Sequence, residues 1–195
     1  MPRYAVIDVG TNSDLLLIAE PAGSSWDFLL DVTAITRMGQ GLTQTGQIGD
    51  EALQRNVDCL RRYRNLCDDY HVEQIAAVGT SALRDARNSQ EVLARIADEA
   101  GIHIEIIDGE TEARLSYLAV RHDSGLELPA EGMVGVIDIG GGSAELILGR
   151  KTLEAAKSAN VGAVRMTETY LKSDPPAQDH YCSMVERIHA EVTEL

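Results

Sequence analysis

The chain has 195 residues, 44% of them hydrophobic and 25% charged, which suits one globular domain or one domain and part of a second. Its formal net charge of −14 argues against a general nucleic-acid or anionic-membrane surface, because both of those partners are polyanions. No apolar run approaches the roughly 20 residues of a membrane span, and the N-terminus lacks a signal-peptide pattern, so we expect a cytoplasmic protein.

Short apolar runs bounded by turn residues predict strands along much of the chain. The run Tyr4–Val9 alternates little, which is typical of a strand buried on both faces, and Val134–Ile139 has the same character. Turns are predicted at Gly10–Ser13 and Pro21–Ser25. In chain order the predicted strands are Tyr4–Val9, Leu15–Ala19, Phe28–Arg37, Gln74–Val78, Ile102–Ile107, Val134–Ile139 and Ala144–Leu148.

Apolar residues at helical spacing predict three helices between these strands. The first begins at Asp50. The second begins at Asn88, which forms a capping-box pattern with Glu91, and it closes at Gly101. The third begins at Gly109, and the alternation of strands and helices predicts an α/β fold. The apolar positions of the first and third helices are Leu53, Val57, Leu60, Cys67, Ala113, Leu115, Leu118 and Ala119.

Other features of the chain are interpreted as structural. The three cysteines Cys59, Cys67 and Cys182 form neither a metal-type CxxC nor a paired framework, so we expect buried thiols. The segment Gly125–Gly132 is typical of a linker, and Met184–Leu195 is expected to be helical. Most arginines of the helix that begins at Asp50 are expected to lie on a solvated face; they are Arg55, Arg61, Arg62 and Arg64.

An internal repeat carries the functional hypothesis. Val6–Ser13 and Val136–Ser143 share five of eight residues, and each is followed by an apolar strand. Glycine in such a turn permits close backbone approach, and successive backbone N–H groups can cradle phosphate oxygens. One such turn would be read as an ordinary hairpin; two copies, each with a strand-end aspartate and a serine, favour a phosphate site.

Carboxylates beside these turns indicate a cation. Asp8 and Asp138 each end an apolar strand, where an uncompensated charge would be costly, so each is expected to face a metal ion or water. Glu145 begins the strand that returns from the second turn. Oxygen ligands without a His/Cys cluster fit Mg²⁺ best, and we therefore predict Asp138, Glu145 and Asp8 as its ligands.

Six ordered segments together resemble a known family: Ile7–Ser13, Arg37–Leu42, Gly79–Asn88, Glu105–Leu115, Asp138–Glu145 and Gly162–Glu168. The resemblance is to the exopolyphosphatase / guanosine pentaphosphate phosphohydrolase family, within the superfamily of actin, sugar kinases and heat-shock ATPases. The first and fifth segments are common to the superfamily, whereas the third, fourth and sixth are specific to the family.

The resemblance implies two ribonuclease-H-like domains with the substrate in the cleft between them. Residues 1–124 would be the first domain, 125–132 the linker and 133–195 the start of the second. Glu112 matches the catalytic glutamate that aligns the attacking water, and Arg84 matches an arginine near the phosphates. With the two turns, the predicted phosphate-binding residues are Gly10, Thr11, Asn12, Ser13, Arg84, Gly140, Gly141, Gly142 and Ser143.

The sequence departs from the family pattern at two motifs. After Ser13 the family has an apolar or aromatic residue and then a basic one, but Asp14 and Leu15 stand here. An anion replaces a cation near the first turn, which should weaken phosphate binding if Asp14 faces the cleft. Asp108 also replaces a serine before Gly109. The family continues beyond the length of this chain, so a fragment and a shortened relative both remain open.

The leading hypothesis is a Mg²⁺-dependent exopolyphosphatase acting on inorganic polyphosphate. The same machinery could instead remove the 5′ γ-phosphate of guanosine pentaphosphate, and a non-catalytic binder of alarmones or polyphosphate is a further alternative. A kinase is disfavoured, because the Glu112 motif points to water as the acceptor. We expect no nucleic-acid or membrane partner, and a homodimer is the assembly considered.

Overall fold

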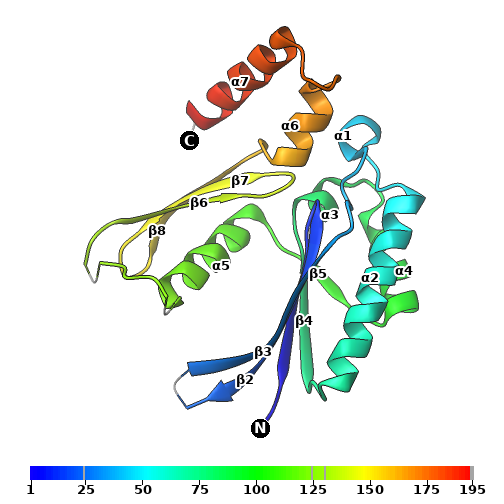
Figure 1. Cartoon of the computed structure of the whole chain (residues 1–195), viewed down its shortest axis with the longest axis vertical. Coiled ribbons are helices and arrows are strands. Elements are labelled where there is room, and N and C mark those ends of the chain that lie inside the picture. The colour runs from blue at the N-terminus through cyan, green and yellow to red at the C-terminus, as the bar shows by residue number, and fades with distance from the viewer. Residues whose placement is uncertain (24, 124, 130, 194–195) are drawn as a thin grey trace. The chain divides into compact units, whose positions relative to one another are not determined.

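The computed structural model describes residues 1–23, 25–123, 125–129 and 131–193. Position 24 of the predicted turn, 124 and 130 at the predicted linker, and 194–195 of the predicted C-terminal helix lie outside the described residues. Contacts divide the chain into two compact units, Met1–Ile106 and Ile107–Leu195 (Figure 1). The division falls before the helix that begins at Gly109; the assignment of 1–124 and 133–195 to two domains stays a prediction.

The first unit is built on a five-stranded sheet in the order β3-β2-β1-β4-β5. Strands β1 to β3 form an antiparallel meander, and β4 then pairs in parallel with both β1 and β5. All five predicted strands are present, but β2 is longer than expected, β3 begins and ends earlier, and β5 is shorter. The strands are β1 (Tyr4–Val9), β2 (Ser13–Ala22), β3 (Ser25–Ile35), β4 (Gln74–Gly79) and β5 (Ile104–Ile106).

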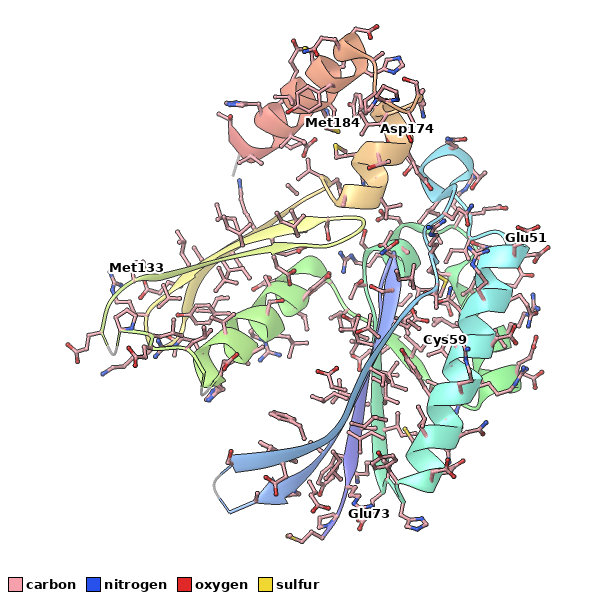
Figure 2. All side chains as sticks on the ribbon, in the orientation of Figure 1. Glu51, Cys59, Glu73, Met133, Asp174 and Met184 are labelled. Atoms are coloured by element: carbon pink, nitrogen blue, oxygen red, sulfur yellow. The ribbon has the colours of Figure 1, made fainter. Side chains whose placement is uncertain are left out.

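Helices α2 and α4 lie on the same face of this sheet and enclose the larger apolar core (Figure 1). All four apolar positions predicted for α2 are buried, and Cys59 is buried with them (Figure 2). Cys67 is buried as expected, but Cys182 is exposed, so the prediction was wrong for that thiol. The helices of the unit are α1 (Leu42–Thr45), α2 (Asp50–Asp69), α3 (Ser81–Asp85) and α4 (Ser89–Ala100).

The predicted capping box at the start of α4 is wrong. Asn88 is the N-cap residue, but its side chain makes no capping hydrogen bond. Its amide instead accepts from the Ile48 backbone N–H and donates to the Ile48 carbonyl, each at 3.0 Å. A tertiary contact that satisfies two backbone groups has replaced the local one. Gly101 closes the helix in the left-handed region at φ 67°, as predicted.

The second unit contains a three-stranded antiparallel sheet in the order β6-β7-β8. Helix α5 packs on one face of it through Ala113 and Tyr117. Leu115 and Leu118, predicted to be buried, are 42% and 41% exposed, and Ala119 is exposed as well, so of the predicted face only Ala113 is buried. The elements are α5 (Gly109–His122), β6 (Val134–Ile139), β7 (Ala144–Gly149), β8 (Leu153–Ala159), α6 (Ala163–Tyr170) and α7 (Gln178–Thr193).

The two copies of the repeat differ in how much of their first strand is covered. Ile7 and Val9 of β1 are 0% and 1% exposed, whereas Ile137 and Ile139 of β6 are 70% and 68% exposed. Burial on both faces is therefore wrong for β6, and in β1 the outer face is only partly covered, with Val6 49% exposed. No helix in the described part of the chain is long and apolar enough to cross a membrane.

Candidate functional site: two phosphate-type turns and a carboxylate cluster

The first turn joins β1 to β2 and is closed by its own backbone. Gly10 N–H donates to the Ser13 carbonyl at 3.1 Å. The segment after β3 then packs against the turn: the amides of Thr36 and Arg37 donate to Asn12 O at 3.1 and 2.9 Å. Gly39 N–H donates to Thr11 O at 2.8 Å, and a Cβ on Gly39 would lie only 2.3 Å from Thr11 Cγ2. Glycine therefore allows this close approach without displacing the Thr11 side chain.

These contacts fix the direction of the amides in the first turn. In a trans peptide the C=O and the following N–H point to opposite sides. Because the carbonyls of Thr11 and Asn12 face the segment after β3, the N–H groups of Asn12 and Ser13 point away from it. Two successive amides aimed in one direction can donate to the same anion.

The second turn is built in the same way. Gly140 N–H donates to the Ser143 carbonyl at 2.9 Å. The segment after β8 closes it: Ala163 N–H donates to Gly140 O at 2.9 Å, and Val164 N–H to Gly141 O at 2.8 Å. The N–H groups of Gly141 and Gly142 therefore point away from α6. The sequence repeat is thus confirmed as a repeated strand–turn–strand with a repeated closing segment.

Two further contacts hold this second turn against the start of α6. Arg165 Nε donates to the Gly142 carbonyl at 2.7 Å. A Cβ on Gly162 would lie 2.4 Å from backbone atoms of Gly141, closer than real atoms come. The segment Gly162–Glu168, which the sequence offered only as a resemblance, therefore has a local structural role.

The residues across from the two aspartates make the turns unequal. Asp8 of β1 is paired with Leu15, whereas Asp138 of β6 is paired with Glu145. Because paired residues share one face of a sheet, Asp138 and Glu145 present two neighbouring carboxylates. The first turn has one carboxylate and a half-exposed leucine in the same places.

Glu145 lies at the centre of an acidic cluster in the second unit. It is only 2% exposed, and Ser158 Oγ donates to its Oε1 at 2.7 Å. Burial raises the pKa of Glu145; hydrogen bonds from Ser158 and Ser143 oppose this, and the charges of Glu112 and Asp138 add to it. The predicted residues Glu112, Asp138, Ser143 and Glu145 therefore lie within electrostatic reach of one another.

Helix α5 positions Glu112 beside this cluster. Asp108 caps the helix, and its side chain accepts from the Thr111 N–H at 2.8 Å. Glu112 is half-buried in the first turn of the helix. One turn later, Ser116 Oγ donates to Asp138 Oδ2 at 2.6 Å, so the same face of α5 reaches β6. Asp108, a departure from the family pattern, here serves as the N-cap.

Arg84 belongs to the first unit, on the short helix α3 that follows β4. Thr80, just before this helix, donates its N–H to the carbonyl of Val9 at 3.3 Å, next to the first turn. Arg84 is half-buried. The predicted site residues thus fall into two groups: Asp8, the first turn and Arg84 in one unit, and the second turn with the three other carboxylates in the other.

Asp14 does not add a carboxylate to the phosphate side of the first turn. It is 0% exposed on the core face of the sheet, where its Oδ1 accepts from Thr36 Oγ1 at 3.1 Å. Side chains alternate along β2, so Leu15 takes the outer face beside Asp8. On the outer face, the departure from the family pattern is therefore the leucine in place of a basic residue at position 15. Asp14 does not face that side, so the expectation that it would weaken phosphate binding there is not supported.

The sequence did not identify the hydroxyls that hold the carboxylates. Ser116 lies four residues after Glu112, and this helical spacing could have revealed it. Ser158 is brought to Glu145 by the pairing of β7 with β8, which no local pattern encodes. Thr36 likewise reaches the first turn through the register of β2 with β3.

Beside the second turn, the groups that could bind a metal ion are the carboxylates of Asp138 and Glu145. Within the described residues no group of three or more His, Cys, Asp or Glu side chains is arranged to hold one. Mg²⁺, however, is commonly bound by one or two carboxylates, with water and substrate phosphate completing its shell. The pair Asp138 and Glu145 fits that kind of site, because a cation would offset the charges crowded around the buried Glu145.

The mixed α/β fold and its paired glycine-containing turns define an actin-like ATPase domain. A crystal structure of an exopolyphosphatase from Cytophaga hutchinsonii ATCC 33406 superposes with a TM-score of 0.89 at 32% identity, covering 97% of this chain and 60% of that one. The model of the Ppx/GppA phosphatase family matches residues 17–195. The chain therefore belongs to the Ppx/GppA phosphatase family, a family of hydrolases.

Relatives of two kinds are similar to the chain. Exopolyphosphatase 2 of Mycobacterium tuberculosis (strain ATCC 25618 / H37Rv) is 40% identical over 185 residues, covering 90% of this chain and 57% of that protein. Guanosine-5′-triphosphate,3′-diphosphate pyrophosphatase of Aliivibrio fischeri (strain MJ11) is 35% identical over 185 residues, covering 94% of this chain and 36% of that protein. The chain thus spans about half or less of the length of these relatives.

Proposed function

We propose that the chain carries the phosphate-handling part of a Mg²⁺-dependent exopolyphosphatase, which releases terminal orthophosphate from inorganic polyphosphate. The observation that carries this proposal is the cluster of Glu112, Asp138 and Glu145, brought together from α5, β6 and β7 beside a phosphate-type turn. Membership of a phosphatase family and the 40% identity to an exopolyphosphatase support the substrate class.

Glu112 is the residue we assign to the attacking water. Its carboxylate would orient the water and accept a proton from it as the oxygen forms a bond to the terminal phosphorus. The bridging P–O bond breaks on the opposite side, and the shortened polyphosphate leaves with the electron pair of that bond. Glu112 is half-buried in the first turn of helix α5, which Asp108 caps.

The two turns would bind the phosphate oxygens. Successive amides in each turn point away from the segments that close it, and amides donate to phosphate without adding charge. Arg84 would add a forked cationic donor, which suits phosphate oxygens. Asp138 and Glu145 would hold Mg²⁺, which when bound offsets the negative charge of the reacting phosphoryl group.

Phosphate release from long-chain polyphosphate in the presence of Mg²⁺ tests the proposal directly. We expect Glu112→Ala to lower the rate by about 10²- to 10⁴-fold, the usual contribution of a positioned acid–base group. Glu110→Ala is the matched control, because Glu110 is an exposed glutamate in the same helical turn. Release that Glu112→Ala does not reduce would contradict the assigned mechanism.

Guanosine pentaphosphate, run in parallel, addresses the alternative substrate. The 35% identity to a guanosine pyrophosphatase is the observation that favours it. Release from pentaphosphate but not from polyphosphate would assign the second activity to the same carboxylates. Tight binding of either ligand without release from the wild-type chain would instead favour a binding role.

A further inference from the structure

Thr36 directly follows β3, and hydrogen bonds hold three of its own groups. Its N–H donates to Asn12 O at 3.1 Å, and its carbonyl accepts from Arg55 Nε at 2.9 Å. Its hydroxyl donates to Asp14 Oδ1 at 3.1 Å. Because Thr36 is 3% exposed, these three bonds fix it in the protein interior, directly against the first turn. Arg55 therefore has a structural role and is an exception to the solvated face expected for most arginines of this helix.

Asp14 occupies a position where the fold does not need a carboxyl group. It is 0% exposed, and its carbonyl accepts from Tyr63 Oη at 2.8 Å. Its second oxygen, Oδ2, has no N–H or O–H donor among the described residues. The equivalent residue of the second turn, 130 positions later, is Ala144, so the same turn forms with a methyl group there. A buried carboxyl costs free energy that an apolar side chain would not.

The hydrogen bond from Thr36 connects the buried carboxyl of Asp14 to the first turn. Thr36, together with its neighbour Arg37, holds the carbonyl of Asn12, and the plane of that peptide sets the direction of the next amide, on Ser13. We infer that Asp14 is a positioning residue for phosphate binding, which orients the first turn through Thr36. The identity of the ligand as a phosphate chain rests on the proposed function. The effect of Asp14 on the geometry of the first turn does not depend on that function.

Three substitutions separate positioning from mere packing. Asp14→Asn keeps an oxygen acceptor for Thr36 in a side chain of the same shape. Asp14→Leu fills the buried site with an apolar side chain and removes the acceptor, and Thr36→Val removes the donor. Asp14→Leu removes a costly buried carboxyl but leaves the Thr36 hydroxyl without its acceptor, so we expect a melting temperature close to that of the wild type. A loss of binding in that variant would therefore not be a loss of folding.

Amide hydrogen exchange reports on the turn without any ligand. We expect the amides of Thr36, Arg37 and Gly39 to exchange about tenfold faster in Asp14→Leu and Thr36→Val, the effect of losing one hydrogen bond. In Asp14→Asn their exchange should match that of the wild type. Equal exchange in the wild type and Asp14→Leu would overturn the inference.

Phosphate release from long-chain polyphosphate then tests the functional consequence. We expect KM to rise about tenfold in Asp14→Leu and in Thr36→Val, with a smaller change in kcat, and to recover in Asp14→Asn. The double variant Asp14→Leu/Thr36→Val should be no worse than either single variant, because both remove the same bond. Additive losses would contradict a shared pathway. If the wild-type chain released no phosphate, the proposed function would fail, and the exchange experiment would still decide the positioning role.

Discussion

The buried carboxyl of Asp14 should make the free energy of unfolding depend on pH. Burial raises the pKa of its carboxyl from 3.8 to about 7, against hydrogen bonds from Thr36 and Cys59 that lower it. Two ionisable groups of α2 face it, Cys59 and Tyr63, and Asp8 of β1 adds a smaller repulsion. Burial also raises the pKa of the Cys59 thiol to about 11, and it raises the pKa of Tyr63 as well. Neither of these groups should therefore ionise between pH 5 and 8.

The sign of the effect follows from the raised pKa. Below pH 3.8 both the folded and the unfolded chain hold the Asp14 proton, and the stabilising contribution of the neutral carboxyl is fully present. As the pH rises from there through about 7, the unfolded chain loses the proton first, so the free energy of unfolding falls. A shift of this size corresponds to about 4 kcal/mol in total, of which about 3 kcal/mol is lost between pH 5 and pH 8.

Urea unfolding of the wild type and of Asp14→Asn at pH 5 and pH 8, followed by circular dichroism, measures this loss. Asparagine does not titrate, so the contributions of all other groups cancel in the difference between the two proteins. We expect the variant to gain about 3 kcal/mol relative to the wild type on going from pH 5 to pH 8. Asp14→Leu should show the same pH-dependent gain. Parallel stability profiles for wild type and variants would refute the buried, neutral carboxyl.

Three further predictions concern the repeat and the helix beside it. In urea unfolding, Ile7→Ala should lower the free energy of unfolding by about 2–5 kcal/mol. The repeat-equivalent Ile137→Ala should change it by about 0.5 kcal/mol or less, because the Ile137 side chain is already exposed. Similar losses in the two variants would contradict the difference in burial. Gly162→Ala should destabilise the chain by about 1–3 kcal/mol and slow phosphate release, because its Cβ has no room against the second turn; Gly49→Ala, where a Cβ meets open space, is the control. Asp108→Ala should lower stability by about 1 kcal/mol by removing the cap of α5, and an unchanged melting temperature would argue against that cap.

Local chemistry explains why much of the fold could be predicted. Strands β1 and β6 were located at their observed bounds, and α2 was located by its apolar spacing. Burial was harder, because it depends on partners distant in sequence: Ile7 and Ile137 occupy the same place in the repeat, but β4 pairs beside β1 and helices cover Ile7. The capping box predicted at Asn88 was wrong for the same reason. The Asn88 side chain is hydrogen-bonded to the backbone of Ile48, which lies 40 residues away in sequence.

Some site residues could be predicted because one short segment of sequence holds several of them, so no distant partner has to be known. The two turns and their aspartates follow from the repeat alone. The hydroxyls of Ser116 and Ser158 were not found, because a serine has many ordinary roles and only the tertiary fold brings each to a carboxylate. Asp14 was recognised as a departure, but sequence could not tell which face of β2 would carry it.

The pairing of β-strands explains why we assign phosphate binding to both turns but Mg²⁺ binding only to the residues beside the second turn. Both turns orient their amides in the same manner, so both can donate to phosphate oxygens without adding charge. Only the second places a carboxylate, Glu145, across from its strand-end aspartate; the first has Leu15 there. Two carboxylates attract a divalent cation more strongly than one carboxylate beside a leucine does. Replacing Leu15 with arginine should therefore strengthen phosphate binding without altering the Mg²⁺ requirement, whereas Glu145→Gln should raise the Mg²⁺ concentration needed for half-maximal phosphate release. The same Mg²⁺ requirement in Glu145→Gln as in the wild type would place the cation elsewhere.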